Sequence, residues 1–570
     1  MARERILVAQ MTRMGDVLQT SPLVRALKQR HPDAHITAMV RRMGKAIAEC
    51  NPDIDDVIVY EEDETYLDLR SDDADRLFKA YSDADAYVQR LVAGRFDVAY
   101  NCTHSLCSAM LFKLAGIPEV VGAHLSDDWR YVWRGRGPNY FITSVLHREA
   151  NDLNICDAFR HFMDDPPATH GLVMEIDDHP RAQAGVLLSQ HGISERDFLV
   201  CFQLGASDRD KRWPEERFAR LAKLLVQRYG ARIVLLGVDA EAPLGKAFEQ
   251  HAPGVAAHLF GKTNIPQLAA ILERARVLVT NDTGTMHIAA AVRCPIVLLS
   301  VGYVHFRETG PYGAGHCAIE VRRADAGRSD MRGRDTAGES GILPEHALRA
   351  VELVITGAGA IPTLEDDGDL ANVDLHWSDF AQDGCLQWYP IVRREAAELD
   401  VVRMAYRPMW LQYFAQGSNQ TFPVQSDRID SSASETDSIK RIAQHYLPLS
   451  DSSFWQSARE SLAGLASLAD RGAATTGELL TILRSHGAMR RAQGLVRGLM
   501  ALDEDIRVYA ELNRACKPLA AIARFERDNL EGAEPLALAE TTLRIYQNIA
   551  ERARGLMASL EMVREAMEGA

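Results

Sequence analysis

Residues 6–30 read ILVAQMTRMGDVLQTSPLVRALKQR, and this stretch decides the fold of the first part of the chain. The apolar run Ile6–Gln10 predicts a buried strand. Ser21 and Pro22 mark the start of a helix, because serine favours the N-cap and proline the first helical position. The residues after the proline repeat their apolar side chains with helical spacing. The stretch is therefore a strand–loop–helix unit, with the loop TRMGD at the carboxyl end of the strand.

The same pattern continues on both sides of a connection at residues 164–171. Before it, the expected strands are HITAMV, NPDIDDVIVY and FDVAYN. From Phe198 onward they are FLVCFQL, ARIVLLG, RVLVTN and PIVLLSV, with helical patterns between them. Strands that alternate with helices predict parallel β-α-β units. We therefore expect two doubly wound α/β domains, over residues 1–170 and 171–360, with ligands at the carboxyl ends of their strands.

From about residue 361 the character of the sequence changes. Residues 363–379 carry six acids and no lysine or arginine, and residues 417–438 are rich in serine, so both predict linkers. Beyond Ser438 the pattern is helical, and we expect an all-helical domain within 361–570, from about residue 375. One heptad-like seam runs through Leu536, Ala539, Leu543, Tyr546, Ala550, Ala553, Met557 and Leu560, and a second through Leu502, Ile506, Tyr509, Cys516, Ala520 and Ala523. Two interpretations stay open: a bundle that packs its own core, and self-association or partner docking through residues 439–570.

The composition of the 570 residues excludes several classes of protein. The chain is 47% hydrophobic and 25% charged, which argues against disorder and fibrous structure. A net charge of -15 argues against a broadly basic surface, so no nucleic acid is expected as a partner. The N-terminus lacks the apolar core of a signal peptide, and no run reaches the length of a membrane span. Nine scattered cysteines without a CxxC pair suit a reducing compartment, so we expect a cytoplasmic protein.

Asp16 is the first candidate for chemistry. It closes the loop after the first strand, where Gly15 permits a tight turn or the close approach of a ligand. A carboxylate at this edge could accept a proton from a hydroxyl. The alternative is an acid that only favours the positive end of the next helix.

The turn NDTGTMH at residues 281–287 is the second candidate. A buried strand ends at Asn281 and a helix follows, so the turn exposes unpaired amide groups that suit a phosphate. The hydroxyl of Thr283 adds a donor, and His287 could face the same anion. The alternative is that Asp282 is a plain N-cap and His287 a packed histidine.

Two further loops end strands of the second domain. The first, residues 205–214, offers Ser207 and Lys211 to phosphate charge. The second contains Glu241, which could accept hydrogen bonds from ribose hydroxyls. The alternatives are a solvated charged loop and a surface acid. The sequence contains no DxD cluster at a plausible strand end and no His/Cys set with ligand spacing, so no metal and no other cofactor is expected.

Five segments together resemble the heptosyltransferase family, glycosyltransferase family 9. They are MGDVLQTSPLVRALKQRHPDAHIT, NPDIDDVIVY, GASDRDKRWPEERFARLA, LLGVDAE and VTNDTGTMHIAAAV, and their order and spacing agree over about residues 5–310. The resemblance implies a GT-B fold, in which two Rossmann-like domains share one active site. It implies an enzyme that moves heptose from ADP-heptose to an acceptor hydroxyl with inversion. It says nothing about the C-terminal third.

The resemblance also assigns roles. It makes Asp16 the general base and gives Lys211 a part in holding the donor and its leaving group. It places the donor against Gly15, Ser207, Glu241, Asp282, Thr283, Gly284 and His287. On the acceptor side the basic candidates are Arg13, Arg41, Arg42 and Lys45.

Two segments depart from the family pattern. Residues 60–95 form a long acidic stretch on the acceptor side, and residues 321–341 form a loop rich in Arg and Gly. The expected acceptor is a bacterial glycan of the inner-core lipopolysaccharide type, or else a protein. For the glycan we expect a peripheral enzyme at the cytoplasmic face of the inner membrane. Two alternative functions stay open: a sugar-nucleotide epimerase on the same fold, and a non-catalytic scaffold that works through its helical domain.

Overall fold

The computed structural model describes residues 3–61, 67–68, 70–322, 341–357, 360–364, 368–415, 438–485, 489–532 and 534–569. The chain forms two compact units. Unit 1 contains residues 1–103 and 153–393, and unit 2 contains residues 104–152 and 394–570. Three of the segments discussed above lie partly outside the described residues. They are the Arg- and Gly-rich loop (residues 323–340), the Ser-rich stretch (nearly all of 417–438) and the acidic stretch at 60–95 (residues 62–66 and 69). The domain bounds at residues 170 and 360 stay predictions.

The first part of unit 1 is built on four parallel strands in the order β3-β2-β1-β4. They are β1 (Arg5–Gln10), β2 (His35–Val40), β3 (Asp56–Val59) and β4 (Val98–Asn101). The accompanying helices are α1 (Met14–Gln19), α2 (Ser21–Arg30), η1 (Arg42–Gly44), α3 (Lys45–Glu49), α5 (Ala74–Gly94) and α8 (Ile155–Arg160). All four strands were predicted from their apolar runs; β1, β2 and β4 are mostly buried, whereas β3 at the edge buries only Ile58.

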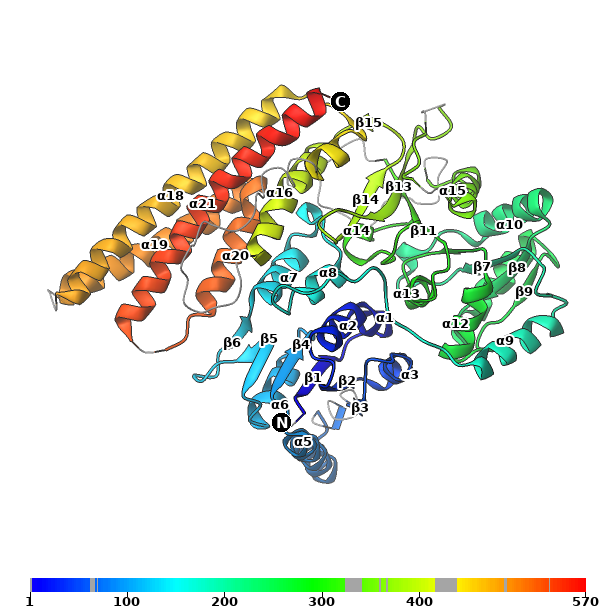
Figure 1. The fold of residues 1–570 in the computed structure, drawn as a ribbon, viewed down its shortest axis with the longest axis horizontal. Helices are drawn as coiled ribbons and strands as arrows, with labels where there is room; N and C mark the ends of the chain where they lie inside the picture. Colours follow the sequence, from blue (N-terminus) through cyan, green and yellow to red (C-terminus); the bar gives the residue numbers. More distant parts are fainter. Residues whose placement is uncertain are drawn as a thin grey trace. The chain divides into compact units, whose positions relative to one another are not determined.

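The second part of unit 1 is an eight-stranded sheet in the order β14-β13-β12-β11-β10-β7-β8-β9 (Figure 1). The strands that run parallel are β7 (Leu199–Gln203), β8 (Arg232–Leu236), β9 (Ala256–His258), β10 (Val277–Thr280), β11 (Ile296–Ser300) and β12 (Cys317–Val321). The helices are α9 (Asp178–Gln190), η3 (Arg209–Lys211), α10 (Glu215–Tyr229), η4 (Asp239–Glu241), α11 (Ala242–His251), α12 (Ile265–Arg274), α13 (Gly284–Ala291), α14 (Phe306–Thr309) and α15 (Pro344–Thr356). Their core contains fully buried side chains such as Phe202, Phe218 and Trp213.

The sequence interpretation is wrong for the start of the C-terminal third. Residues 363–379 were expected to be linker, and helices were expected from about residue 375. Instead β13 (Val373–Phe380) and β14 (Leu386–Pro390) add two antiparallel strands to the second sheet. Nearly every residue of both strands is buried, including Asp374 and His376. The sheet therefore extends further along the chain than the acidic composition of this stretch suggested.

Unit 2 is mainly helical. It contains α6 (Leu106–Leu114), β5 (Glu119–Leu125), β6 (Tyr131–Arg134), α7 (Arg136–Leu146), η2 (Arg148–Ala150), β15 (Arg394–Glu395), α16 (Glu398–Ala415), β16 (Tyr446–Leu447), α18 (Ser452–Arg484), α19 (Met489–Leu512), η5 (Arg514–Cys516), α20 (Lys517–Asp528) and α21 (Pro535–Glu568). Strands β5 and β6 pair antiparallel, and β15 and β16 form a short parallel pair. Among the described residues, the predicted helical region is confirmed from Glu398 onward, apart from the short strand β16.

The long helices α18 and α21 lie side by side (Figure 1). Most of the predicted heptad seam of α21 is buried, and Tyr546 of that seam is fully buried. The two helices approach closely at Gly472 of α18, where an added Cβ would lie 2.4 Å from Cδ1 of Tyr546. The α21 seam thus contributes to the core of its own unit.

The two parts of unit 2, which are far apart in the sequence, share one core. Tyr140 of α7 packs edge-on against Trp410 and Phe414 of α16, with ring centroids 5.0 and 5.1 Å apart. Asn529, which ends α20, accepts a hydrogen bond from the backbone N–H of Trp133 at 2.8 Å. Residues 104–152 therefore complete the helical unit. Among the described residues, no helix is long and apolar enough to cross a membrane.

Candidate active site

The first turns of α1 and α13 meet within unit 1 (Figure 1). A Cβ added to Gly15 would lie 2.7 Å from Cδ2 of His287, and a Cβ added to Gly284 would lie 2.6 Å from Cε of Met14. Glycine at both positions therefore allows an approach that no other residue would permit without a shift. The structure thus brings together the TRMGD loop and the turn at 281–287, two of the candidate sites predicted from the sequence.

Asp16 is half-buried in the first turn of α1. Its Oδ2 accepts hydrogen bonds from the Thr12 hydroxyl at 2.5 Å and from the Arg13 backbone N–H at 3.0 Å. Among the described residues, no donor is bonded to Oδ1. Asp16 does interact with the amino end of its own helix, which was the alternative role considered for it in the sequence. The same bonds fix the orientation of the carboxylate and leave one oxygen available.

His287 lies in the second turn of α13 and is buried against Gly15. Burial lowers the pKa of His287, and the nearby charges of Asp282 and Asp16 oppose that effect in part. Its Nδ1 has no hydrogen-bond partner among the described residues. The imidazole is therefore held neutral near two carboxylates, with one ring nitrogen still able to bond a donor or an acceptor.

Lys211 and Asp282, from two separate predicted loops, form an ion pair. The Nζ of Lys211 lies 3.0 Å from Oδ2 of Asp282, and both side chains are largely buried. The same Nζ lies 4.6 Å from the centre of the Tyr303 ring, a cation–π contact. An ammonium group carries three hydrogens, so the lysine is held in place while keeping donors for another anion.

Tyr303 connects this lysine to the neighbouring loop. Its hydroxyl donates to Oδ2 of Asp208 at 2.8 Å. That hydrogen bond is the main cause of the lowered pKa of Asp208 and of the raised pKa of Tyr303. The charge of Arg13 acts on Tyr303 in the opposite direction, so the first-domain loop lies near this ring. Ser207, next to Asp208, is exposed and makes no hydrogen bond with a described residue.

Glu241 fits into a space that two glycines leave open. A Cβ on Gly205 would lie 1.5 Å from Oε1 of Glu241, and one on Gly237 would lie 2.4 Å from Oε2. The carboxylate accepts from the Gln203 amide at 3.0 Å and from the Val238 backbone N–H at 3.0 Å. These contacts fix the carboxylate at the carboxyl ends of β7 and β8.

The turn before α13 is held by a buried amide. Asn281 accepts from the backbone N–H of Trp213 at 2.9 Å and donates to the carbonyl of Leu204 at 2.8 Å. Thr283 is the N-cap residue of α13, and its side chain makes no cap hydrogen bond. The neighbouring loop therefore positions the first amides of α13. Free amides at the amino end of a helix suit an anion.

The basic residues predicted on the acceptor side lie close to α1. A Cβ on Gly44 would lie 2.8 Å from Cγ2 of Val17, which shows how tightly η1 packs against α1. Arg42 donates to Glu61 at 3.0 Å, and Lys45 pairs with Glu49 at 3.5 Å. Arg41 follows β2 and is half-buried. The structure places these side chains beside the site without joining them to Asp16.

Sequence reasoning missed two polar side chains that organise the site, Gln203 and Tyr303, and it gave no role to a third, Asn281, beyond ending the strand before the turn. Gln203 links Glu241 to α13, because its Oε1 accepts from Thr285 at 3.2 Å. All three residues lie at or just beyond the carboxyl ends of parallel strands. For Gln203 and Asn281 that position was the available signal, since ligands of doubly wound sheets bind there.

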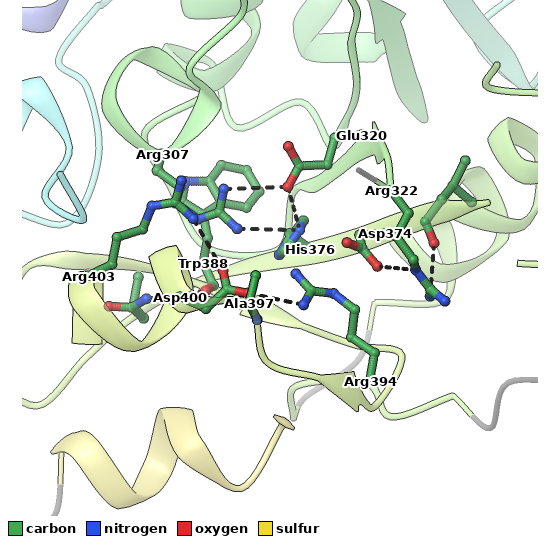
Figure 2. Close-up of polar contacts among 12 residues, drawn as sticks. Arg307, Glu320, Arg322, Asp374, His376, Trp388, Arg394, Ala397, Asp400 and Arg403 are labelled. Atoms are coloured by element: carbon green, nitrogen blue, oxygen red, sulfur yellow. Dashed lines mark hydrogen bonds and ion pairs between the residues drawn. The ribbon is translucent and has the colours of Figure 1, made fainter. Parts of the chain in front are cut away.

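Figure 2 shows a buried charge cluster elsewhere in unit 1, at β12 and β13. Possible metal-ligand atoms of Glu320, Asp374 and His376 lie within 4.8 Å of one another. Arg322 pairs with Asp374 at 3.1 Å, and Arg307 lies 3.5 Å from Glu320. Two guanidinium groups therefore already balance the two carboxylates, and the pKa of His376 is lowered by burial. We interpret the cluster as a structural network that holds β13 in the sheet.

Known proteins resemble this chain in sequence and in fold. Residues 85–329 match the family described as "Glycosyltransferase family 9 (heptosyltransferase)". Lipopolysaccharide heptosyltransferase 2 of Escherichia coli K12 is 26% identical over 313 residues, which are 52% of this chain and 82% of that protein. Lipopolysaccharide heptosyltransferase 3 of the same strain is 24% identical over 293 residues, 50% of this chain and 79% of that protein. A solved structure of a glycosyl transferase family 9 protein from Veillonella parvula covers 62% of this chain and 99% of its own, with a TM-score of 0.50 and 22% identity. This last likeness concerns the fold, and the predicted fold class is confirmed.

Proposed function

Since the chain carries a glycosyltransferase family 9 (heptosyltransferase) domain and is a glycosyltransferase, we propose that it moves heptose from ADP-heptose to an acceptor hydroxyl with inversion. The proposed acceptor is an inner-core lipopolysaccharide-type glycan, after the names of the relatives. A protein acceptor is the alternative. We propose that the reaction takes place in the bacterial cytoplasm, where the enzyme would meet a lipid-linked acceptor at the inner face of the membrane.

One observation carries the proposal. The loop that holds Asp16 and the turn that begins α13 meet at Gly15 and His287. Inverting transfer needs a base on one side of the anomeric carbon and stabilisation of a departing diphosphate on the other. The meeting of these two turns supplies one candidate group for each task.

We assign the role of general base to Asp16. The acceptor oxygen attacks the anomeric carbon, its proton passes to the carboxylate, and the bond from that carbon to the diphosphate oxygen breaks. The hydrogen bonds from Thr12 and Arg13 hold Oδ2, so Oδ1 is the atom that takes the proton. The products are the heptosylated acceptor, ADP and a protonated Asp16, which then releases its proton to water.

We assign the departing diphosphate to Lys211 and to the first amides of α13, with Thr283 and Ser207 as added hydroxyl donors. Asp282 and Tyr303 hold the ammonium group of Lys211 in place. Lys211 and the helix amides supply the positive charge that a metal ion would otherwise bring, so we propose a metal-independent reaction. Glu241 is proposed to accept from the ribose hydroxyls of the donor.

Mass spectrometry of products tests this proposal. The purified chain is incubated with ADP-heptose and a truncated inner-core glycan, and we expect the acceptor to gain one heptose while ADP is released. NMR of the new linkage should show the anomeric configuration opposite to that of the donor. An epimerised nucleotide sugar formed without any acceptor would overturn the transferase proposal and support the epimerase alternative.

A pair of substitutions tests the base. Asp16→Asn preserves the shape of the side chain but removes its basicity, so transfer should fall by about 10²–10⁴-fold while ADP still binds. Asp33→Asn, which changes an exposed acid in the same part of the chain, is the matched control and should leave transfer unchanged. Normal transfer by the Asp16→Asn variant would show that the base is a different residue.

A further inference from the structure

Helix α19 buries only one of its faces. Ala492, Leu499, Leu502, Ile506 and Ala510 point into the unit, where α19 packs against α18 and α20 (Figure 1). Outside that face the helix exposes large apolar side chains: Met489 is 66% exposed, Met500 68% and Leu512 80%. Met489 and Met500 are eleven residues, about three turns, apart and so share one side of the helix, whereas Leu512 lies on another.

Four charged residues follow the exposed face at intervals of one heptad. They are Arg490, Arg497, Glu504 and Glu511, all exposed. Residues seven apart lie on nearly the same side of a helix, so these four charges form one line. The amino-terminal half of the line is positive, the carboxyl-terminal half is negative, and Met500 and Ala501 lie at its centre.

This order of charges is complementary to itself when the helix is reversed. We propose that α19 pairs antiparallel with α19 of a second copy of this chain, about a two-fold axis between Met500 and Ala501. Arg497 then faces Glu504 of the second copy, and Arg490 faces Glu511 of the second copy. The two-fold axis makes each contact occur twice, which gives four ion pairs around a centre of methionine and alanine. A parallel pair would instead set like charges opposite each other.

The present contacts of these side chains leave them able to pair. Within the part of the chain that the structure describes, Arg490 and Arg497 make no ion pair. Glu504 pairs with Arg507 of its own helix at the surface, and Glu511 pairs with Lys517 at 3.1 Å. Exposed pairs of this kind contribute little stability, so either acid can add an arginine of the second copy. A Cβ on Gly494 or Gly498 would meet nothing within 4 Å, so the helix surface at these two glycines is open to close approach.

Sedimentation velocity on the full chain tests the proposal. The wild-type chain should form dimers at micromolar concentration. Arg497→Glu should raise the dimer dissociation constant roughly tenfold or more, because two attractive contacts become repulsive. Glu504→Arg should do the same. The swapped variant Arg497→Glu/Glu504→Arg should dimerise like the wild type, since opposite charges face each other again. This recovery separates a lost interface from a misfolded chain.

Arg491→Glu is the matched control. It makes the same charge change one residue away from Arg490, but Arg491 pairs with Glu478 of α18, so dimerisation should persist. A wild-type chain that stays monomeric would overturn the proposal, even if it bound another protein through this face. So would equal weakening by Arg491→Glu and Arg497→Glu, or a swapped variant that stays monomeric. None of these readouts depends on glycosyl transfer.

Discussion

A Cβ on Gly15 would lie only 2.7 Å from Cδ2 of His287, so the first turn of α1 and the second turn of α13 fit together only because residue 15 has no side chain. Real Cβ contacts are longer than this, and His287 is buried with little room to move. The contact therefore sets the separation between the proposed base and the proposed diphosphate site.

Gly15→Ala should reduce glycosyl transfer about tenfold or more, because the new methyl group displaces His287 and a small misplacement at a reacting centre slows the reaction strongly. Initial rates with ADP-heptose measure this loss. Gly185→Ala is the control, since a Cβ at that helical position meets nothing within 4 Å. If the clash is the cause, Gly15→Ala should add little further loss to a His287→Ala background. Independent losses in the double variant would contradict the explanation.

Lys211→Met should lower kcat by about 10²–10³-fold, because it removes one positively charged donor from the proposed leaving group. Thermal unfolding should change little in comparison. Asp282→Asn should have a smaller effect, since it removes only the acid that holds the ammonium group. Lys223→Met, an exposed lysine on α10, is the control. Unchanged turnover in Lys211→Met would remove this lysine from the mechanism.

Acidification should destabilise the chain through His316. Burial lowers the pKa of His316 to about 4, whereas in the unfolded chain it is about 6.5. Below pH 6.5 the unfolded state binds more protons than the folded one, so stability falls as the pH falls. The loss from this residue between pH 8 and pH 5 is about 2 kcal/mol.

Denaturant unfolding of the wild type and of His316→Leu, each at pH 8 and pH 5, measures how much His316 contributes to the loss of stability on acidification. The variant should lose about 2 kcal/mol less on acidification, because leucine does not titrate. Other buried histidines contribute equally to both chains and cancel in the comparison. Identical losses in the two chains would show that His316 takes up a proton in the folded state as easily as in the unfolded one.

Two glycines on α18 should respond oppositely to alanine. At Gly472 a Cβ would lie 2.4 Å from the Tyr546 ring, so Gly472→Ala should destabilise unit 2 by about 1–3 kcal/mol through overpacking. At Gly477 a Cβ meets nothing within 4 Å, so Gly477→Ala should stabilise it by about 0.5–1 kcal/mol. Thermal denaturation followed by circular dichroism compares the two. A shift of the same sign in both variants would contradict the proposed close packing of α18 on α21.

Most of the parallel strands could be predicted because each is an apolar run that is largely buried in a sheet, whereas the short strands β9 and β12 were not predicted. Strand β13 escaped prediction because its buried face carries Asp374 and His376. The arginines that balance this charge, Arg307 and Arg322, come from residues well before the strand. A local pattern contains no information about such distant partners, so the stretch resembled an acidic linker.

In the candidate site, too, some residues could be predicted from the local sequence and others depend on distant partners. Asp16, Lys211 and the turn at 281–287 stand out, since charged or small residues follow buried strands. Tyr303 could not be singled out in this way, because an aromatic residue after a strand is ordinarily part of a core. Only the fold brings its ring to the ammonium group of Lys211 and its hydroxyl to Asp208.

The sharing of one core by residues 104–152 and the C-terminal helices has a consequence for synthesis on the ribosome. Roughly 240 residues separate the two parts, and a translating ribosome adds ~5–20 residues per second, so the first part waits about 12–50 s for the second. During that interval Tyr140 lacks the Trp410 ring that later packs against it, and the backbone N–H of Trp133 lacks its acceptor, Asn529. The packing surface of the first part therefore stays open until the C-terminal helices are made, and slow codons after residue 152 would lengthen that interval.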